Sequence, residues 1–136
     1  MLLTSNDVKM FNKLYSKPRK NEFGFVAIDN KKNTIIGACT FGSSSTGRAS
    51  HVGEVGCGVH LDYFRIGVAT KLLKAILKEA KERGFIKVDA EVARNNIASI
   101  KLVKRCGFVL EGTKRRGLLL DSGKYEDMCM FGKILT

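Results

Sequence analysis

The residues best suited to chemistry form one short segment, in which a predicted strand ends and an amphipathic helix begins. This segment runs from Val59 to Leu73 and reads VHLDYFRIGVATKLL. The N-terminus of a helix offers unpaired backbone N–H groups and the positive end of the helix dipole. Because Gly67 and Ala69 are small, an anion can reach those groups, and the segment predicts a phosphate-binding turn. The alternative is an ordinary tight turn, since the segment contains neither a Walker loop nor a GxGxxG fingerprint.

Hydrophobic periodicity predicts the elements that position this turn. From Gly67 to Arg83, apolar residues recur every four positions and lysines lie largely on the other face, which predicts a helix. The strand from Val52 to His60 contains three glycines, which are expected where a ligand or another chain approaches the backbone closely. The other predicted strands span 23–29, 34–41, 85–92, 108–120 and 124–135, and the other predicted helices span 4–17 and 95–105.

The order of these elements predicts an α/β fold with a mixed sheet and helices on both faces. A strand, a helix and a strand follow one another from Val52 to Val92, which implies one right-handed parallel crossover. The hairpins predicted at 23–41 and 108–135 imply antiparallel margins. The length of 136 residues fits a single domain, residues 1–136, without internal repeats or a linker.

Composition narrows the classes of protein further. Hydrophobic residues make up 44% and charged residues 27%, which excludes wholesale disorder. The chain has no apolar run of membrane-spanning length and no signal peptide, so we expect a cytoplasmic protein without a membrane partner. The net charge of +11 suits an anionic partner, which the charge alone leaves open among nucleic acid, anionic lipid and a phosphorylated cofactor.

The cysteines and histidines predict neither a metal site nor a disulfide. No two cysteines form a CxxC pair, and the chain has only two histidines, so the closely spaced ligand pairs of a zinc site are missing. In a cytoplasmic protein, disulfides are rare. We therefore expect four buried thiols that act as small hydrophobic side chains: Cys39, Cys57, Cys106 and Cys129.

Two motifs in the expected order resemble one family. Residues 59–73 resemble the acetyl-CoA pyrophosphate loop of the GNAT superfamily of N-acetyltransferases, V-x-P-x-Y-(Q/R)-x-x-G-x-(G/A)-T-x-L-L. Residues 96–112 resemble a second pattern, N-x-x-(A/S)-x-x-L-x-x-(K/R)-x-G-F-x-x-E-G. With Arg116, Gly123, Tyr125 and Asp127, this second run is similar to the branch that contains ribosomal-protein N-terminal and small-amine acetyltransferases. The resemblance covers residues 23–135, and its first motif matches at Val59, His60, Tyr63, Gly67, Ala69, Thr70, Leu72 and Leu73.

The resemblance implies a centrally splayed sheet and an acetyl-CoA-dependent N-acetyltransferase. Such an enzyme transfers acetyl to a primary amine by direct attack, and the amine is a small amine, an amino acid or a protein N-terminus. Acetyl-CoA is the cosubstrate, and the resemblance implies no metal. Its pantetheine arm would contact the backbone of two residues after the strand bend and the side chain of an asparagine, and its pyrophosphate would bind the turn. The implied binding residues are Val59, Leu61, Arg65, Ile66, Gly67, Val68, Ala69, Thr70 and Asn96.

The resemblance also implies two catalytic residues. Glu54 stands where the family often places a general base, which helps because an amine with a pKa near 10 is only about 1 part in 10³ neutral at pH 7. Val103 replaces the tyrosine that many members use as the proton donor to CoA. Ser99, one helical turn earlier, is the implied substitute donor of a hydrogen bond to the sulfur. A solvated carboxylate and an ordinary surface serine are the structural alternatives.

Several departures and alternatives remain open at this point. Only about 20 residues precede Phe23, so we expect the N-terminal strand of the family to be missing or reduced to residues 1–3. Leu61 replaces the usual proline of the loop, and Phe64 replaces a polar residue. The alternative functions are a basic nucleic-acid-binding module and a non-catalytic CoA-binding protein. The chain lacks the interleaved surface aromatics of RNA-binding proteins, which disfavours nucleic acid, and a homodimer is an open alternative.

Overall fold

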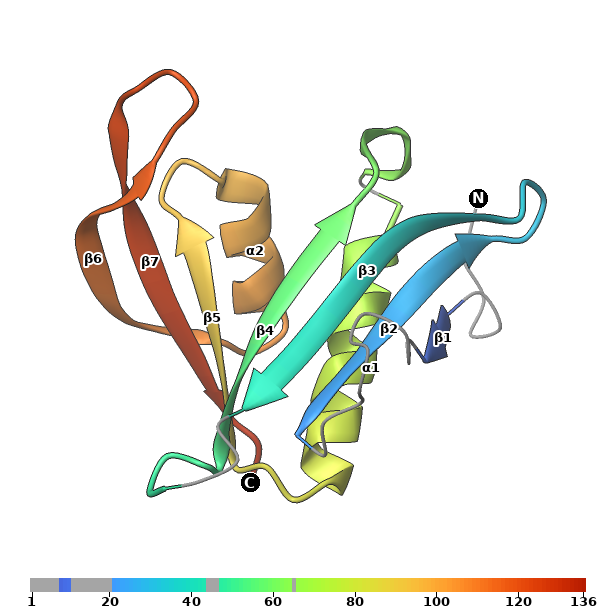
Figure 1. Cartoon of the computed structure of the whole chain (residues 1–136), viewed down its shortest axis with the longest axis horizontal. Coiled ribbons are helices and arrows are strands. Elements are labelled where there is room, and N and C mark those ends of the chain that lie inside the picture. Colours follow the sequence, from blue (N-terminus) through green and yellow to red (C-terminus); the bar gives the residue numbers. More distant parts are fainter. Residues whose placement is uncertain (1–7, 11–20, 44–46, 65) are drawn as a thin grey trace.

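The computed structural model describes residues 8–10, 21–43, 47–64 and 66–136. The described residues form a seven-stranded sheet in the order β1-β2-β3-β4-β5-β7-β6, together with two α-helices and one 3-10 turn (Figure 1). In chain order the elements are β1 (Val8–Met10), β2 (Glu22–Asp29), β3 (Thr34–Ser43), β4 (Val52–Val59), η2 (Leu61–Tyr63), α1 (Val68–Glu82), β5 (Lys87–Ala93), α2 (Ile97–Arg105), β6 (Val109–Leu119) and β7 (Tyr125–Ile134).

The sheet is mixed, as predicted. Every neighbouring pair of strands is antiparallel except β4 and β5, which are parallel and joined through α1. This connection is the predicted crossover, because a parallel pair requires the chain to return along the face of the sheet. None of the described helices is long and apolar enough to cross a membrane.

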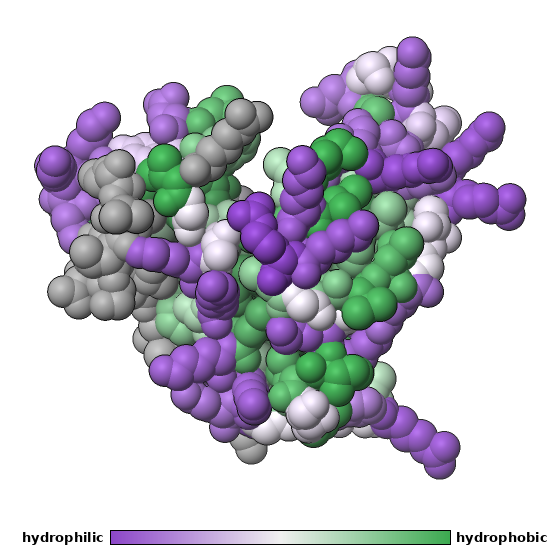
Figure 2. All heavy atoms as spheres, turned by 180° about the vertical axis from the view of Figure 1, so that it is seen from behind, coloured by the Kyte–Doolittle hydropathy of each residue, from purple (hydrophilic) through white to green (hydrophobic). Residues whose placement is uncertain are grey.

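The core lies between the sheet and the helices. One side of α1 is buried against β2, β3 and β4, and α2 buries a single residue, Val103. Both helices line one pocket together with Lys133 of β7, so the two described α-helices lie on the same side of the sheet, whereas the order of elements predicted helices on both faces. Figure 2 shows this helical side, where long hydrophilic side chains stand beside hydrophobic ones in the middle of the face. The buried residues of α1 are Val68, Leu72, Leu73, Ile76 and Ala80.

A close aromatic contact explains one of the glycines in β4. The ring of Phe41 stacks on Phe23 at 4.7 Å and meets Phe85 edge-on at 4.8 Å, measured between centroids. A Cβ at Gly53 would stand 1.9 Å from the Phe41 ring, so only glycine fits at this position. We expected the glycines of this strand to allow a ligand or another chain to come close to the backbone. At Gly53 the group that comes close is a core side chain of the same chain, Phe41.

The predicted helix over residues 4–17 is wrong where the structure describes it. Val8–Met10 is a short strand, β1, that pairs antiparallel with residues 25–27 of β2. In a short segment the spacing of apolar residues fits either a helix or a strand, and here pairing with β2 prevails over the helical pattern. A short N-terminal strand is confirmed at residues 8–10, whereas residues 1–3, where it was expected, lie outside the described residues. Residues 1–7 and 11–20 lie outside the described residues.

The prediction of four buried thiols is also wrong for one pair. Cys39 and Cys57 form a disulfide, with their Cα atoms 4.1 Å apart. They are 18 residues apart in sequence, but the antiparallel register of β3 and β4 places them directly opposite each other. Cys39 is fully buried and Cys57 is exposed. Cys106 and Cys129 are free and buried, as expected.

Candidate active site

The sheet opens between β4 and β5. The two strands pair only from Val52 to Glu54, against Lys87 to Asp89, and then separate (Figure 1). Along Val55–Val59, the edge of β4 that faces β5 has no strand partner among the described residues. Backbone polar groups need a partner when they are removed from water. This edge can therefore bind an extended ligand that carries amide groups of its own.

The turn between β4 and α1 presents backbone donors at the end of this opening. Gly67 is the N-cap of α1 and has a φ of 87°, a left-handed conformation that favours glycine. None of the described side chains caps this end of the helix. The first helical hydrogen bond runs from the Lys71 N–H to the Gly67 carbonyl at 3.1 Å. The N–H groups of Val68, Ala69 and Thr70 precede it and have no backbone partner among the described residues, so they are available to an anion.

The structure brings most of the predicted binding residues to this turn. Val59 ends β4, Leu61 begins η2, and Ile66 and Gly67 lead directly into the helix. The side chains of Leu61 and Phe64 are 74% and 53% exposed, so the rim of the turn is apolar where the family pattern has proline and a polar residue. Arg65 lies outside the described residues.

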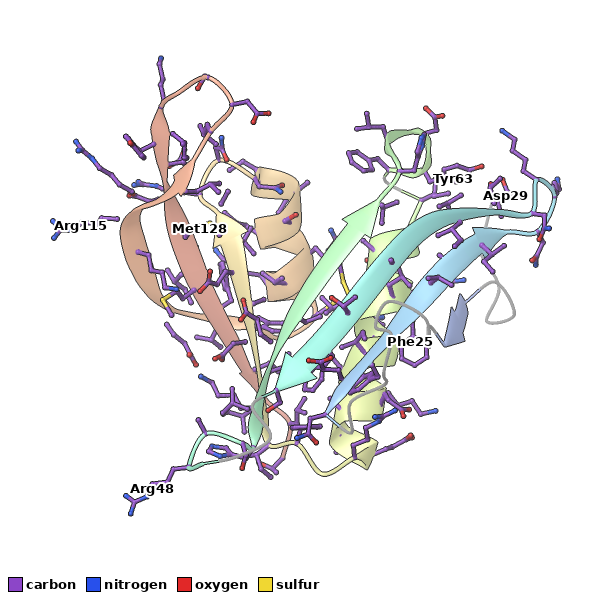
Figure 3. All side chains as sticks on the ribbon, in the orientation of Figure 1. Phe25, Asp29, Arg48, Tyr63, Arg115 and Met128 are labelled. Atoms are coloured by element: carbon purple, nitrogen blue, oxygen red, sulfur yellow. A yellow bond between two sulfur atoms is a disulfide. The ribbon has the colours of Figure 1, made fainter. Side chains whose placement is uncertain are left out.

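A hydrogen-bond cluster anchors the turn to the β2–β3 hairpin. The Tyr63 hydroxyl donates to Asp29 Oδ2 at 2.5 Å, and the two side chains lie side by side in Figure 3. The backbone N–H groups of Lys31 and Lys32 donate to Asp29 Oδ1 at 3.0 and 3.4 Å. Asp29 is only 4% exposed. The hydrogen bond from Tyr63 holds the pKa of Asp29 below its usual value despite burial, and it raises the pKa of Tyr63.

Glu54 lies on the face of the sheet opposite the helices. Its neighbours Gly53 and Val55 face the core, and successive side chains in a strand alternate between faces. The Glu54 side chain is exposed, at the last residue pair before the strands separate. Across the sheet, Lys114 of β6 donates to Glu91 of β5 at 2.5 Å. This bond raises the pKa of Lys114, and the Glu54 carboxylate adds to the shift.

The residues predicted on α2 have different surroundings. Asn96 is the N-cap of the helix, and its Oδ1 accepts a hydrogen bond from the Ser99 N–H at 3.2 Å. The Ser99 side chain is half-buried, whereas Val103 is 5% exposed and belongs to the core. The position at which many family members have a tyrosine is therefore occupied by a buried core valine in this chain. Ser99 lies in the first turn of α2, which follows the strand on the far side of the opening.

Two of the residues that follow the second motif, Arg116 and Asp127, have structural contacts. Asp127 accepts hydrogen bonds from the Arg116 N–H at 2.8 Å and from Arg94 Nη1 at 3.4 Å. Arg116 has a φ of 51°, and the register between β6 and β7 shifts beside it. Asp127 therefore stabilises a bulge in the hairpin. Among the described residues, no group of three or more His, Cys, Asp or Glu side chains is arranged to hold a metal ion.

Sequence reasoning did not single out Asp29. Its position before a polar turn is the signal of an Asx turn, which the bonds from Lys31 and Lys32 form. Its bond to Tyr63 joins residues 34 positions apart and leaves no local signal.

Comparison with known proteins agrees with this geometry. A family model described as the acetyltransferase (GNAT) family matches residues 4–108. The solved structure of a GNAT-family acetyltransferase from Streptococcus pneumoniae is 26% identical with a TM-score of 0.79, and the match covers 84% of this chain and 67% of that one. An N-acetyltransferase from Staphylococcus aureus Mu50 is 28% identical with a TM-score of 0.77, covering 85% and 68%.

A third similar structure carries a more specific description. The ribosomal-protein-S5-alanine acetyltransferase from Vibrio fischeri is 27% identical with a TM-score of 0.73, and the match covers 83% of this chain and 61% of that one. No curated protein matches the chain. The family model covers well over half of the sequence, and the splayed sheet and the turn before α1 agree with it. The chain therefore belongs to the GNAT family of acetyltransferases.

Proposed function

We propose that this chain transfers the acetyl group of acetyl-CoA to a primary amine by direct attack. The observation that carries the proposal is the combination of an unpaired edge on β4 with an uncapped N-terminus on α1. Together they present amide partners for the pantetheine arm and N–H donors for the pyrophosphate. Val59 and Leu61 would contact the arm, and the residues from Ile66 to Thr70 would bind the pyrophosphate. Asn96 would donate to the arm through its Nδ2 group while it caps α2, because the cap uses only Oδ1, which accepts from the Ser99 N–H.

The two substrates would approach from opposite faces of the sheet. The α1 N-terminus belongs to the helical side, whereas Glu54 faces the other side. An amine that enters past Glu54 would meet the thioester in the opening between β4 and β5. Holding both groups in this geometry supplies most of the rate enhancement, because the bimolecular reaction becomes effectively unimolecular.

The proposed reaction transfers the acetyl group in a single displacement, without an acyl-enzyme intermediate. Glu54 accepts a proton from the ammonium group, directly or through a water. The amine nitrogen attacks the thioester carbonyl carbon, the carbon–sulfur bond breaks, and CoA leaves as a thiolate. The nitrogen then loses its second proton to solvent water, which leaves the amide. With a thiol pKa near 8.5, the thiolate takes up a proton from solvent in turn, so that CoA is released as the free thiol. The Ser99 hydroxyl would stabilise the developing negative charge on sulfur by a hydrogen bond, because Val103 has no proton to give.

The proposed acceptor is a small amine, an amino acid or a protein N-terminus. Support for the last comes from the second motif, which resembles ribosomal-protein acetyltransferases, and from the description of the Vibrio fischeri neighbour. A non-catalytic CoA-binding protein is the second candidate, because a core valine occupies the position of the usual proton donor.

Binding and turnover separate these candidates. Calorimetry with acetyl-CoA tests binding, and release of free CoA thiol across a panel of small amines, amino acids and N-terminal peptides tests transfer. Binding with turnover on at least one acceptor supports the enzyme. Binding without turnover on any acceptor supports the non-catalytic protein. Absence of binding would refute both, and the Glu54→Gln variant serves as the low-activity control.

A further inference from the structure

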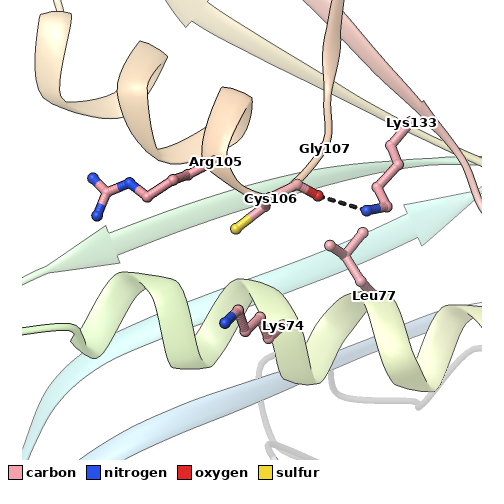
Figure 4. A pocket seen from close by; sticks show the side chains of 6 residues that line it. All are labelled: Lys74, Leu77, Arg105, Cys106, Gly107 and Lys133. Carbon is pink, nitrogen blue, oxygen red and sulfur yellow. Dashed lines mark hydrogen bonds between the residues drawn. The ribbon is translucent and has the colours of Figure 1, made fainter.

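The two faces of the sheet carry different charges near the opening. On the helical side, the described residues that line the pocket between α1 and α2 include the basic Lys74, Arg105 and Lys133 and no acidic side chain (Figure 4). On the opposite face, where the amine is proposed to enter, both basic and acidic side chains surround Glu54. The charges of this second face therefore concern the acceptor rather than acetyl-CoA.

Lys114 belongs to this opposite face and lies beside the opening. Its Nζ is 2.5 Å from Glu91 Oε1 on β5, so the side chain crosses β7, which lies between β6 and β5 (Figure 1). Because the neighbours Ala90 and Val92 are core residues, Glu91 points away from the helices, as Glu54 does. The pKa of Lys114 is raised by Glu91 first and by the Glu54 carboxylate in addition, so the ammonium group interacts with both charges.

The two lysines of this face differ in how far their charges are already paired. Lys87 contacts two carboxylates, Asp89 at 2.9 Å and Glu111 at 2.7 Å, and its side chain is only 23% exposed. Lys114 has a single ion-pair partner among the described residues, Glu91, and its side chain is 51% exposed. An ammonium group carries three N–H donors. Lys114 therefore keeps donors for a second anion, at a place that a substrate can reach.

We propose that the acceptor is a free α-amino acid, with Lys114 binding its carboxylate while Glu54 receives a proton from its ammonium group. The inference rests on the proposed function, which places the acceptor amine at Glu54. An α-amino acid carries a cation and an anion on the same carbon atom, and Glu54 and Lys114 present the opposite pair of charges on one face. In the complex, the charges alternate in sign from Glu54 through the substrate to Lys114 and Glu91, which favours a zwitterion.

The same charges disfavour the other two acceptor classes. A protein N-terminus has a neutral amide in place of the carboxylate, and a simple amine has neither group. Both would bring a cation toward the Lys114 ammonium without an anion to pair with it. Because Lys114 is partly exposed, we expect the additional charge-assisted hydrogen bond to favour the amino acid by about 10-fold.

Paired acceptors isolate this contact. Release of free CoA thiol measures kcat/KM for a panel of L-amino acids, each beside its own α-amide, which keeps the side chain and the amine but lacks the negative charge. For the best amino acid, the wild-type kcat/KM should exceed that of its amide by about 10-fold or more, although the amide has the less basic amine. Lys114→Met should reduce this preference to about 3-fold or less, with kcat/KM for the amide unchanged. Lys114→Arg should keep the preference, because arginine also binds carboxylates.

Lys124→Met is the matched control, because Lys124 is an exposed lysine of the same hairpin that lies just before β7, outside this face. It should keep the wild-type preference, and an equal loss in this variant would reduce the effect to general charge and overturn the inference. Equal or faster wild-type transfer to the amides would also overturn it and point to a protein N-terminus, while the proposed function would stand. An equal fall with both acceptors in Lys114→Met would make its ion pair structural and refute the carboxylate contact. If no acceptor reacts, the proposed transfer fails together with the inference.

Discussion

Gly67 offers a clean test of the proposed pyrophosphate site, because a second glycine at the other end of α1 matches it. Gly67 precedes the helix with a φ of 87°, and Gly84 follows it with a φ of 90°. A Cβ at either position would meet no other atom within 4 Å. Substitution therefore causes similar backbone strain at both sites, about 1–2 kcal/mol, without a steric clash. Only Gly67 adjoins the N–H groups proposed to bind phosphate.

The strain fixes the expected stability of Gly67→Glu and Gly84→Glu. For a chain of this length, 1 kcal/mol corresponds to about 3–5 °C in Tm, so each variant should melt about 3–10 °C below the wild type. At the ligand site, however, the glutamate of Gly67→Glu would block the turn and repel the pyrophosphate. The loss of two charge-assisted hydrogen bonds, at about 1.5–3 kcal/mol each, would weaken acetyl-CoA binding by at least about 100-fold.

The assay is thermal unfolding with and without acetyl-CoA, followed by calorimetry. At 100 times its Kd a ligand stabilises the folded state by about 2.7 kcal/mol, so the wild type and Gly84→Glu should gain about 8–13 °C. Gly67→Glu should gain almost nothing at the same ligand concentration. If Gly67→Glu keeps the wild-type gain, the anion does not bind at the start of α1, and the assignment of this turn is wrong.

The remaining predictions concern proton transfer and the cluster beside the turn. Glu54→Gln should lower the rate about 10²-fold near neutral pH and recover partly at higher pH, and unchanged kinetics would make Glu54 structural. Ser99→Ala should lower turnover about 5- to 150-fold at saturating acetyl-CoA, whereas full activity would remove Ser99 from the mechanism. Val103→Tyr should destabilise the chain by about 1–3 kcal/mol in thermal unfolding without raising turnover, since Val103 is 5% exposed; a gain in turnover would show that the cleft accepts the side chain. Because the pKa of Asp29 is lower in the folded state than its usual value of 3.8, its ionised carboxylate stabilises the fold above pH 3.8. This stabilisation is lost as the pH falls through the pKa of the folded state. Acid titration should therefore destabilise the wild type more than Asp29→Asn. The pKa of Tyr63 is raised in the folded state, so its hydroxyl stabilises the fold below pH 10. This stabilisation is lost as the pH rises through the pKa of the folded state. Tyr63→Phe should be less sensitive to alkali than the wild type, and its KM for acetyl-CoA should rise while kcat changes little.

Local signals in the sequence predicted the elements that carry their own periodicity or cap. The helix expected over 67–83 is α1, and the helix expected over 95–105 is α2, which Asn96 caps through its side chain. The second hairpin turns at residues 121–123, between β6 and β7. Each of these features depends on residues only a few positions apart, so a single sequence contains the information.

Features that depend on contacts between distant residues were not predictable in the same way. Cys39 and Cys57 look like isolated small hydrophobic residues until the register of β3 and β4 aligns them. Likewise, the pairing of Asp29 with Tyr63 requires the hairpin and the turn to meet in space. The pocket that contains Lys74 combines three elements, and its charge emerges only from their packing. The resemblance to the family pattern therefore located the turn, whereas the contacts around it could be found only from the fold.

A single break in strand pairing organises the whole candidate site. If β4 and β5 stayed paired beyond Glu54, the backbone of Val55–Val59 would be satisfied within the sheet and would have nothing to offer a ligand. Because the strands separate there, the Glu54 carboxylate lies at the closed end of the opening and the N-terminus of α1 lies near its open end. The pantetheine arm of CoA would bridge that interval. In the proposed binding mode the donors are backbone groups, so Leu61 and Phe64 can depart from the family pattern at the rim without removing the donors that the turn provides.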